Sequence, residues 1–267
     1  MTGSTLHPSF AELDIRLQEI EDQGFTIFRG YLNRSFTAKM RDHIDAIVGP
    51  VGKTNRARND LRHPIPGKIM ANLANNPATL ELGRILLGSK PNLRMREQVL
   101  IRSDPEPPPY KAELSYHIDA AFSKAEYEVV PKQVYYQMLH YLSTVEPGGA
   151  GVYIVPASHK FSRTELFGND RKKDSEPLDS NTTPAMHRAD GIEICAEDGD
   201  LIVFNPLCFH AASQNRLNKP RYVYFTSFYD TSAARLVEFV RRIGYRDNFP
   251  DSLRNALPHA LKPLLEY

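Results

Sequence analysis

Hydrophobic residues recur at helical spacing in the first third of the chain and in short, dense runs through much of the rest. The helical stripes stop at glycines such as Gly24, and the second stripe opens on Ser35, a favourable N-cap residue. This pattern is typical of amphipathic helices that cover a core on one side. We predict helices at residues 9–24, 35–49 and 76–88, with a short strand at residues 24–32.

From about residue 92 the chain consists of segments rich in β-branched and aromatic residues, separated by Gly, Pro and Asp. Such segments predict strands, and many strands without helices between them favour an antiparallel sandwich or barrel. The predicted strands are residues 93–102, 112–122, 132–142, 151–157, 192–204 and 221–230. The predicted fold class is therefore mainly β with flanking α-helices.

Two further segments complete this prediction. Residues 160–190 are polar and too long for a tight turn, which is typical of a functional flap or a mobile segment. Residues 232–244 are predicted to form a C-terminal helix. No linker interrupts the pattern, so we expect residues 1–267 to form one domain with a β-rich core at about 92–230.

Composition and charge narrow the class of protein. Apolar residues make up 41% and charged residues 24%, and the net charge of +1 indicates neither a nucleic-acid nor an anionic-membrane partner. No apolar run approaches the roughly 20 residues of a membrane span, and the N-terminus lacks the pattern of a signal peptide. Cys195 and Cys208 have apolar sequence neighbours, as expected for buried, reduced thiols in a cytoplasmic protein.

The tetrapeptide His-Ile-Asp-Ala occurs twice, beginning at His43 and at His117. In a helix, residues i and i+2 lie about 200° apart, so His43 and Asp45 cannot readily hold one ion. We expect Asp45 to be a solvated charge and His43 a surface or half-buried residue. In an extended strand, residues i and i+2 project from the same face, so His117 and Asp119 converge on one point.

An iron(II) site for oxygen chemistry typically uses two histidines and one carboxylate. His210 is the candidate for the second histidine because it follows a predicted strand, where functional side chains often lie. Arg221 opens the last predicted strand, and a buried guanidinium requires an anion. That anion is either a dicarboxylate co-substrate or an Asp or Glu of this chain, and Arg221 alone does not decide between them.

The order of these segments resembles the phytanoyl-CoA dioxygenase family of iron(II)- and 2-oxoglutarate-dependent oxygenases, from about residue 12 to 230. The matching segments are "EIEDQGFTIFRGYL", "ELSYHIDAAF", "PGGAGVYIVPASHK" and "AEDGDLIVFNPLCFHAASQNRLNKPR". The resemblance implies a double-stranded β-helix (a jelly-roll, cupin-like fold) with a metal at its open end. It also implies His117, Asp119 and His210 as ligands of Fe(II), Arg221 as the clamp on the far carboxylate of 2-oxoglutarate, and dioxygen as the oxidant.

Two departures from the family pattern bear on the site. The family often has a serine at the position of Ala212, so the hydroxyl that would assist the arginine clamp is missing, and Ser213 or Tyr136 are candidate replacements. Ala157 replaces the glycine of the Pro-Gly-Ser-His element, whose His159 is expected to be a structural turn residue.

The strand at residues 93–102 carries candidate binding residues. Alternation places Arg96 and Gln98 on one face and Val99 and Ile101 on the other. If helices cover the apolar face, Gln98 points inward to bind 2-oxoglutarate and Arg96 points inward to bind substrate. The alternative is that the arginines of this strand are charges on the rim.

The predicted function is oxidation of a small-molecule metabolite in natural-product biosynthesis, by hydroxylation or a related reaction. Asp119 argues against halogenation, because related halogenases replace this carboxylate with a small residue to admit halide. The basic segment at residues 53–68 is either a solvated loop or a lid that holds a carboxylate or phosphate. The alternatives are an acyl-CoA hydroxylase of the same family, a non-catalytic jelly-roll binding protein and a zinc hydrolase.

Overall fold

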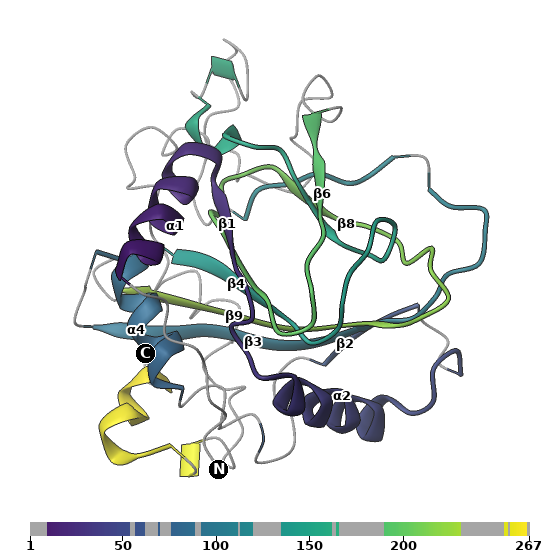
Figure 1. The fold of residues 1–267 in the computed structure, drawn as a ribbon, viewed down its shortest axis with the longest axis horizontal. Coiled ribbons are helices and arrows are strands. Elements are labelled where there is room, and N and C mark those ends of the chain that lie inside the picture. The colour runs from purple at the N-terminus through teal and green to yellow at the C-terminus, as the bar shows by residue number, and fades with distance from the viewer. Residues whose placement is uncertain are drawn as a thin grey trace, which may run out of the picture.

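Two antiparallel sheets face each other, and helices cover the outer face of the larger sheet (Figure 1). The computed structural model describes residues 10–53, 57–61, 69, 76–88, 92–111, 113–119, 135–161, 164–165, 190–230, 254–255 and 257–265. The helices are α1 (Phe10–Gln23), α2 (Arg34–Val48), α4 (Pro77–Leu86) and the short 3-10 helices η1 (Ser158–Lys160) and η4 (His259–Leu265). The strands are β1 (Phe25–Phe28), β2 (Arg58–Leu61), β3 (Leu93–Ser103), β4 (Tyr135–Tyr141), β5 (Val152–Ile154), β6 (Ile192–Ile194), β7 (Leu201–Phe204), β8 (His210–Ala212) and β9 (Arg221–Asp230).

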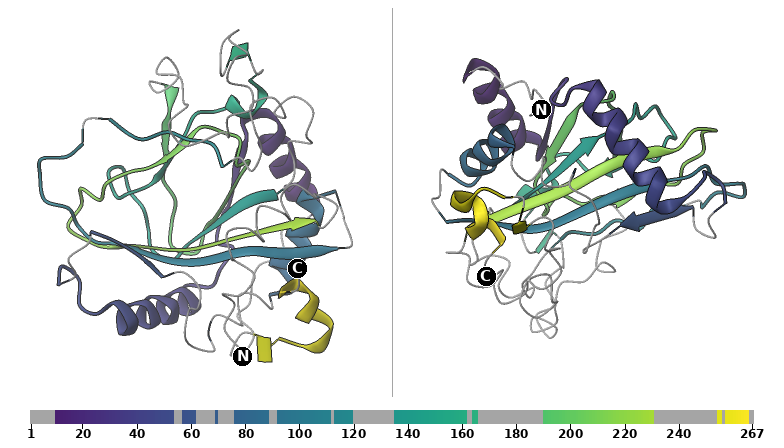
Figure 2. Two further views of the ribbon diagram at one scale, coloured as in Figure 1. Left: turned by 180° about the vertical axis from the view of Figure 1, so that it is seen from behind. Right: turned by 90° about the horizontal axis from the view of Figure 1, so that it is seen from below.

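The six strands of the large sheet are ordered β1-β7-β4-β9-β3-β2, and the three of the small sheet are ordered β6-β5-β8. Figure 2 shows from behind and from below that α2 and α4 lie along the outer side of the long strands β3 and β9. This arrangement confirms the predicted fold class, mainly β with flanking α-helices.

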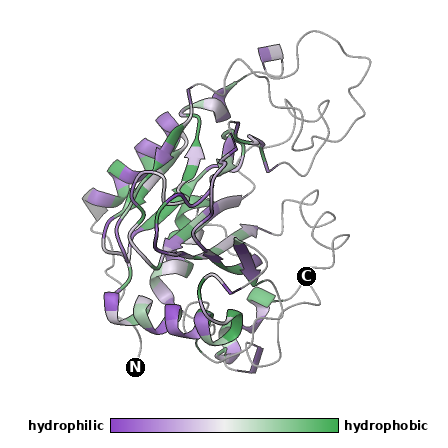
Figure 3. Ribbon diagram, turned by 90° about the vertical axis from the view of Figure 1, so that its right-hand side faces the viewer, coloured by the Kyte–Doolittle hydropathy of each residue, from purple (hydrophilic) through white to green (hydrophobic). Residues whose placement is uncertain are grey.

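The large sheet separates two hydrophobic cores. On its outer side, α2 and α4 contribute buried residues that pack on Leu100, Met138 and Tyr224 of the sheet. On its inner side, Val99, Ile101 and Leu139 pack toward Val152, Ile154 and Ile194 of the small sheet. Each fully buried aliphatic side chain stabilises the fold by about 1.5–3 kcal/mol. In Figure 3 the central strands are mainly hydrophobic, whereas the peripheral helices carry both hydrophobic and hydrophilic positions.

Asp45 of α2, which was expected to be a solvated charge, instead bonds to residues of the large sheet. Asp45 accepts hydrogen bonds from Arg102 at 2.8 Å and from the hydroxyl of Tyr222 at 2.9 Å, so its predicted role as a solvated charge is wrong. Arg102 is fully buried and is also paired with Asp104 at 2.7 Å. His43 is half-buried, as expected.

The N-cap of α2 is Asn33 rather than Ser35. The Asn33 side chain accepts a hydrogen bond from the backbone N–H of Ser35 at 2.8 Å, which places the helix start earlier than the sequence pattern suggested. The helix ends at Gly49, whose φ of 89° lies in the left-handed region that favours glycine.

Strand β3 has the predicted alternation with its two faces exchanged. Leu100 belongs to the helix-covered core, whereas Val99 and Ile101 belong to the core between the two sheets. The register with β9 shifts between Met95 and Glu97, so Arg96 is the extra residue of a β-bulge. This bulge lets Arg96 and its neighbour Glu97 face the same side of the sheet.

Several predicted elements differ in extent. The segment 192–204 is two strands, β6 and β7, and within 113–119 the backbone makes only an isolated bridge at His117. Strand β2 lies within the segment 53–68, which was expected to be a loop or lid. Most of 53–68 and of 160–190, and all of 232–244, lie outside the described residues.

Among the described residues, no helix combines the length and apolarity that crossing a membrane requires. Both cysteines are free thiols. Cys208 is buried as expected, and burial raises its pKa to about 12, whereas Cys195 is only partly buried.

Candidate active site

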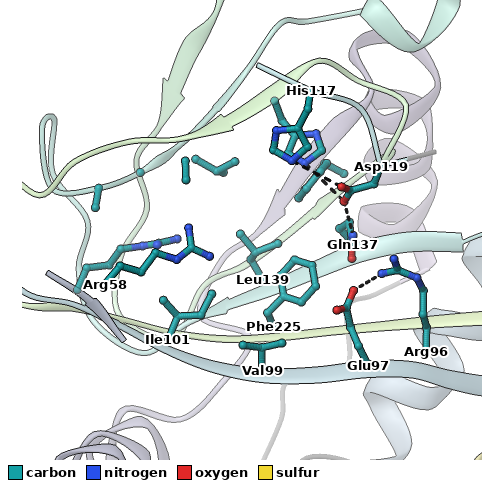
Figure 4. A pocket seen from close by; sticks show the side chains of 17 residues that line it. Arg58, Arg96, Glu97, Val99, Ile101, His117, Asp119, Gln137, Leu139 and Phe225 are labelled. Atoms are coloured by element: carbon teal, nitrogen blue, oxygen red, sulfur yellow. Dashed lines mark hydrogen bonds and ion pairs between the residues drawn. The ribbon is translucent and has the colours of Figure 1, made fainter. Parts of the chain in front are cut away.

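His117, Asp119 and His210 lie together on the side of the cavity formed by the small sheet (Figure 4). Antiparallel backbone bonds of 2.9 Å join His117 to His210 in both directions, and the N–H of Asp119 donates to the carbonyl of Pro206 at 2.8 Å. The extended backbone at 117–119 therefore turns both side chains to one point. One ligand atom from each of the three side chains lies within 4.8 Å of the other two.

The imidazoles are oriented for binding through Nε2. Nδ1 of His210 lies 2.9 Å from the carbonyl of Cys208, and Nδ1 of His117 lies 3.3 Å from the carbonyl of Ser115. A backbone carbonyl holds the proton on Nδ1 and leaves the Nε2 lone pair available to a metal. The two Nε2 atoms lie 3.6 Å and 3.5 Å from the carboxylate oxygens of Asp119, so all three donors face a common centre.

Electrostatics favours an ionised carboxylate at this centre. Burial alone would raise the pKa of Asp119, but His210, Arg96 and His117 hold it well below its usual range. Burial and the neighbouring His210 lower the pKa of His117. Burial opposes the charged form of His210, yet Asp119 raises its pKa above the ordinary value. Two imidazoles and one carboxylate form a donor set that suits iron(II) with open coordination positions.

Strand β4 supports Asp119 from below. The side-chain amide of Gln137 donates to Oδ2 of Asp119 at 2.7 Å, and the hydroxyl of Tyr135 donates to the Asp119 backbone carbonyl at 2.8 Å. Oδ1 of Asp119 faces Nε2 of His117, and Oδ2, which accepts from Gln137, also faces Nε2 of His210. Gln137 and Tyr135 have no signal in the sequence, because only the tertiary fold brings β4 under this carboxylate.

The site opens on a cavity of about 240 Å³ between the two sheets. Its floor is the large sheet, where Val99, Leu139 and Phe225 lie between two charged ends (Figure 4). The residues that line the cavity are Arg58, Arg96, Glu97, Val99, Ile101, His117, Asp119, Gln137, Leu139, Ala150, Gly151, Val152, Phe204, His210, Ala212, Arg221 and Phe225.

Arg221 lies at one charged end. Its side chain is buried, and its guanidinium lies 5.3 Å from the centre of the Tyr141 ring. No carboxylate of the described residues lies within 4.0 Å of it, so an Asp or Glu partner, the alternative that the sequence left open, is not found there. Burial lowers the pKa of Arg221 and the nearby Arg58 charge lowers it further, whereas Tyr141 and the carboxylate of Asp60 partly offset this shift.

The other charged end holds Arg96 and Glu97, which form a buried ion pair. The guanidinium of Arg96 also lies 4.5 Å from the centre of the Tyr135 ring. Arg96 thus lines the cavity as expected, but it does so because of the bulge in β3. Without the bulge, alternation would turn Arg96 to the helices once Glu97 faces inward.

Three other expectations about this site are wrong. Gln98 points to the helix-covered face, where its side-chain amide donates to the Tyr224 hydroxyl at 2.7 Å. The hydroxyl of Ser213 donates to the carbonyl of Gly151 at 2.7 Å, and Ser213 does not line the cavity. Tyr136 packs against α4 on the outer side of the sheet. None of the three reaches the cavity that contains Arg221.

His159 has the structural place expected of it. Its Nε2 lies 3.2 Å from the carbonyl of Glu21 and its Nδ1 lies 3.5 Å from Sγ of Cys208, away from the three candidate ligands. Ala157, where the family has glycine, keeps the left-handed conformation with φ of 59°.

Comparisons with known proteins agree with this geometry. A family model described as phytanoyl-CoA dioxygenase matches residues 20–223. A search of curated protein sequences finds no match.

Several solved structures share the fold. The epimerase SnoN, in complex with Fe3+, alpha ketoglutarate and nogalamycin RO, has a TM-score of 0.63 and 17% identity over 83% of this chain and 85% of its own. HygX from Streptomyces hygroscopicus, with nickel and 2-oxoglutarate bound, has a TM-score of 0.56 and 18% identity over 84% of this chain and 88% of its own. EvdO2 from Micromonospora carbonacea var. aurantiaca has a TM-score of 0.60 and 15% identity over 85% of this chain and 93% of its own.

At these identities the solved structures establish the fold, and the family assignment comes from the sequence match. That match spans most of the chain and includes His117, Asp119, His210 and Arg221. The chain belongs to the phytanoyl-CoA dioxygenase family of 2-oxoglutarate-dependent oxygenases.

Proposed function

We propose that this protein uses Fe(II), 2-oxoglutarate and dioxygen to oxidise a small-molecule metabolite in natural-product biosynthesis. The observation that carries the proposal is the convergence of His117, Asp119 and His210 on the cavity that also contains the buried Arg221. SnoN and HygX, which share the fold, have been crystallised with nogalamycin RO and hygromycin B, and this supports a small-molecule substrate.

In this proposal His117, Asp119 and His210 hold the metal, and Gln137 and the two backbone carbonyls fix the ligand orientations. When bound, iron(II) with 2-oxoglutarate supplies oxidative decarboxylation of the co-substrate and the oxidant for the substrate. Arg221 holds the far carboxylate of 2-oxoglutarate by a charge-assisted, bidentate contact. The apolar floor of Val99, Leu139 and Phe225 contacts the co-substrate carbons and excludes water.

Arg96 is proposed to bind the substrate at the opposite end of the cavity. Arg221 begins β9, whereas Ser227 of the same strand pairs with both Glu97 and Gln137. At about 3.3 Å per residue, Arg221 and Ser227 lie about 20 Å apart along β9. A five-carbon diacid held between the three metal ligands and Arg221 leaves the end with Arg96 and Glu97 to the substrate. Ion-paired Arg96 and Glu97 offer a donor and an acceptor side by side, which suits a neutral, hydroxyl-bearing molecule.

We place this reaction in the cytoplasm, a proposal supported by the two free thiols. The proposed partner is a small molecule, and the proposal includes neither nucleic acid nor membrane.

The experiment is aerobic incubation of the Fe(II)-loaded protein with 2-oxoglutarate and a panel of glycosylated and polyhydroxylated compounds, followed by measurement of succinate. We expect succinate that depends on dioxygen and rises with one class of compound. Conversion of one of the added compounds that proceeds equally without dioxygen contradicts the proposal and favours a hydrolase.

A further inference from the structure

Arg58 is a second guanidinium at the end of the cavity where Arg221 lies, opposite Arg96 (Figure 4). It lies on β2, the edge strand of the large sheet, in a segment whose positive charges were expected to be a solvated loop or a lid. Nothing in the spacing of that segment distinguishes Arg58 from its other basic residues.

The register of three neighbouring strands explains why the two arginines meet. Arg58 of β2 pairs with Ser103 of β3, and Ser103 pairs with Arg221 of β9. Residues in one row across antiparallel strands project from the same face, and adjacent strands lie about 4.8 Å apart. The Cα atoms of Arg58 and Arg221 are therefore about 10 Å apart, and both side chains point into the cavity.

Among the described residues that line the cavity, neither carboxylate is paired with Arg58 or Arg221. Arg96 is paired with Glu97, and Asp119 faces the two histidines. Arg58 is paired with Asp60 at 2.8 Å, but Asp60 does not line the cavity, and the Arg58 side chain is 43% exposed. A buried cation such as Arg221, with a second cation beside it, calls for an anionic ligand.

Residue 212, where the family often has a serine hydroxyl beside the arginine clamp, is an alanine in this chain. Ala212 lines the cavity with a methyl group, and the neighbouring Ser213 hydroxyl is engaged with Gly151. A donor to the far carboxylate must therefore come from another element, and Arg58 is a cationic donor that lines the same cavity.

We propose that Arg58 and Arg221 together bind the far carboxylate of 2-oxoglutarate, so that Arg58 takes the place of the missing hydroxyl and helps select a dicarboxylic 2-oxoacid. This inference rests on the proposed function, because it assumes that 2-oxoglutarate is the co-substrate. Arg221 is the buried, stronger contact, and Arg58, at the exposed edge, is the weaker one.

The test is anaerobic calorimetric titration of Fe(II)-loaded protein with 2-oxoglutarate and with 2-oxobutyrate, which lacks the far carboxylate. We expect Arg58→Ala to weaken 2-oxoglutarate binding about five- to tenfold and Arg58→Lys to recover part of that loss. Asp60→Asn should tighten binding about two- to threefold, because it removes a carboxylate that competes for Arg58. Neither change at residue 58 should alter 2-oxobutyrate binding or iron content.

The matched control is Arg34→Ala, which removes an arginine from a surface ion pair with Glu197 at 2.8 Å, outside the cavity. If the wild type binds 2-oxoglutarate and Arg58→Ala behaves like Arg34→Ala, this inference is wrong and the proposed function stands. Equal weakening of both 2-oxoacids, or loss of iron, also overturns the inference, because Arg58 would then act on the metal site. If the wild type binds no 2-oxoglutarate, the proposed function itself fails.

Discussion

Replacing Arg221 separates co-substrate binding from metal binding. In Arg221→Ala we expect 2-oxoglutarate affinity to fall by roughly two to three decades. The guanidinium of Arg221 is buried, so the proposed contact is shielded from water. No carboxylate of the described residues lies within 4.0 Å to compete for it. Two charge-assisted hydrogen bonds of about 1.5–2 kcal/mol each sum to about 3–4 kcal/mol, and each 1.4 kcal/mol is tenfold in affinity.

The assay is titration of the visible charge-transfer band of the anaerobic iron complex with 2-oxoglutarate. Arg221→Lys should recover only part of the affinity, because an ammonium keeps the charge but lacks the planar fork. Arg221→Met should bind 2-oxoglutarate as poorly as Arg221→Ala, while the ligand-free protein loses no thermal stability, because a desolvated charge has been removed. Normal 2-oxoglutarate affinity in Arg221→Ala would refute the assignment of the clamp.

Three further changes test the supporting structure. Gln137→Leu should lower iron affinity about 10- to 100-fold in competition with a chelator, because Asp119 loses its 2.7 Å hydrogen bond, whereas iron affinity equal to that of the wild type would contradict the role of Gln137. Gly24→Ala should lower the free energy of unfolding in urea by about 2 kcal/mol or more, because φ is +86° and an added Cβ would lie 2.1 Å from Sγ of Cys208; an unchanged midpoint would count against this packing. Burial of His140 lowers its pKa to about 3. Between pH 6.5 and pH 3 the imidazole of His140 is therefore protonated only in the unfolded chain, so the free energy of unfolding decreases as the pH falls. By pH 4.5 we expect a loss of about 2–3 kcal/mol that His140→Leu does not show.

The elements that define the fold could be predicted because their signals are local. Glycines end the first two helices, and the long strands β3, β4 and β9 carry dense β-branched and aromatic runs. The distinction between the two His-Ile-Asp-Ala copies is also local, because it depends only on whether the backbone is helical or extended. His43 lies in α2, whereas His117 lies in an extended segment that pairs with His210.

The remainder of the site depends on long-range pairing. Alternation predicted which residues of β3 share a face only beyond the bulge, and it did not show which face meets the helices. It wrongly grouped Arg96 with Gln98, because the bulge at Arg96 has no signal in the sequence. Arg58 could not be selected because its row partner Ser103 lies far along the chain. Asp45 was assigned to solvent because Arg102 and Tyr222, its partners, come from strands that only the fold brings to α2.

The central claim is that His117, Asp119 and His210 hold an iron ion that binds 2-oxoglutarate. The most direct measurement is the visible spectrum after anaerobic addition of Fe(II) and 2-oxoglutarate to the metal-free wild type, His43→Ala and His210→Ala proteins. We expect a charge-transfer band of equal intensity in the wild type and His43→Ala, and no band in His210→Ala. A wild type without the band, or a His210→Ala variant that retains it, would show that these residues do not form such an iron site.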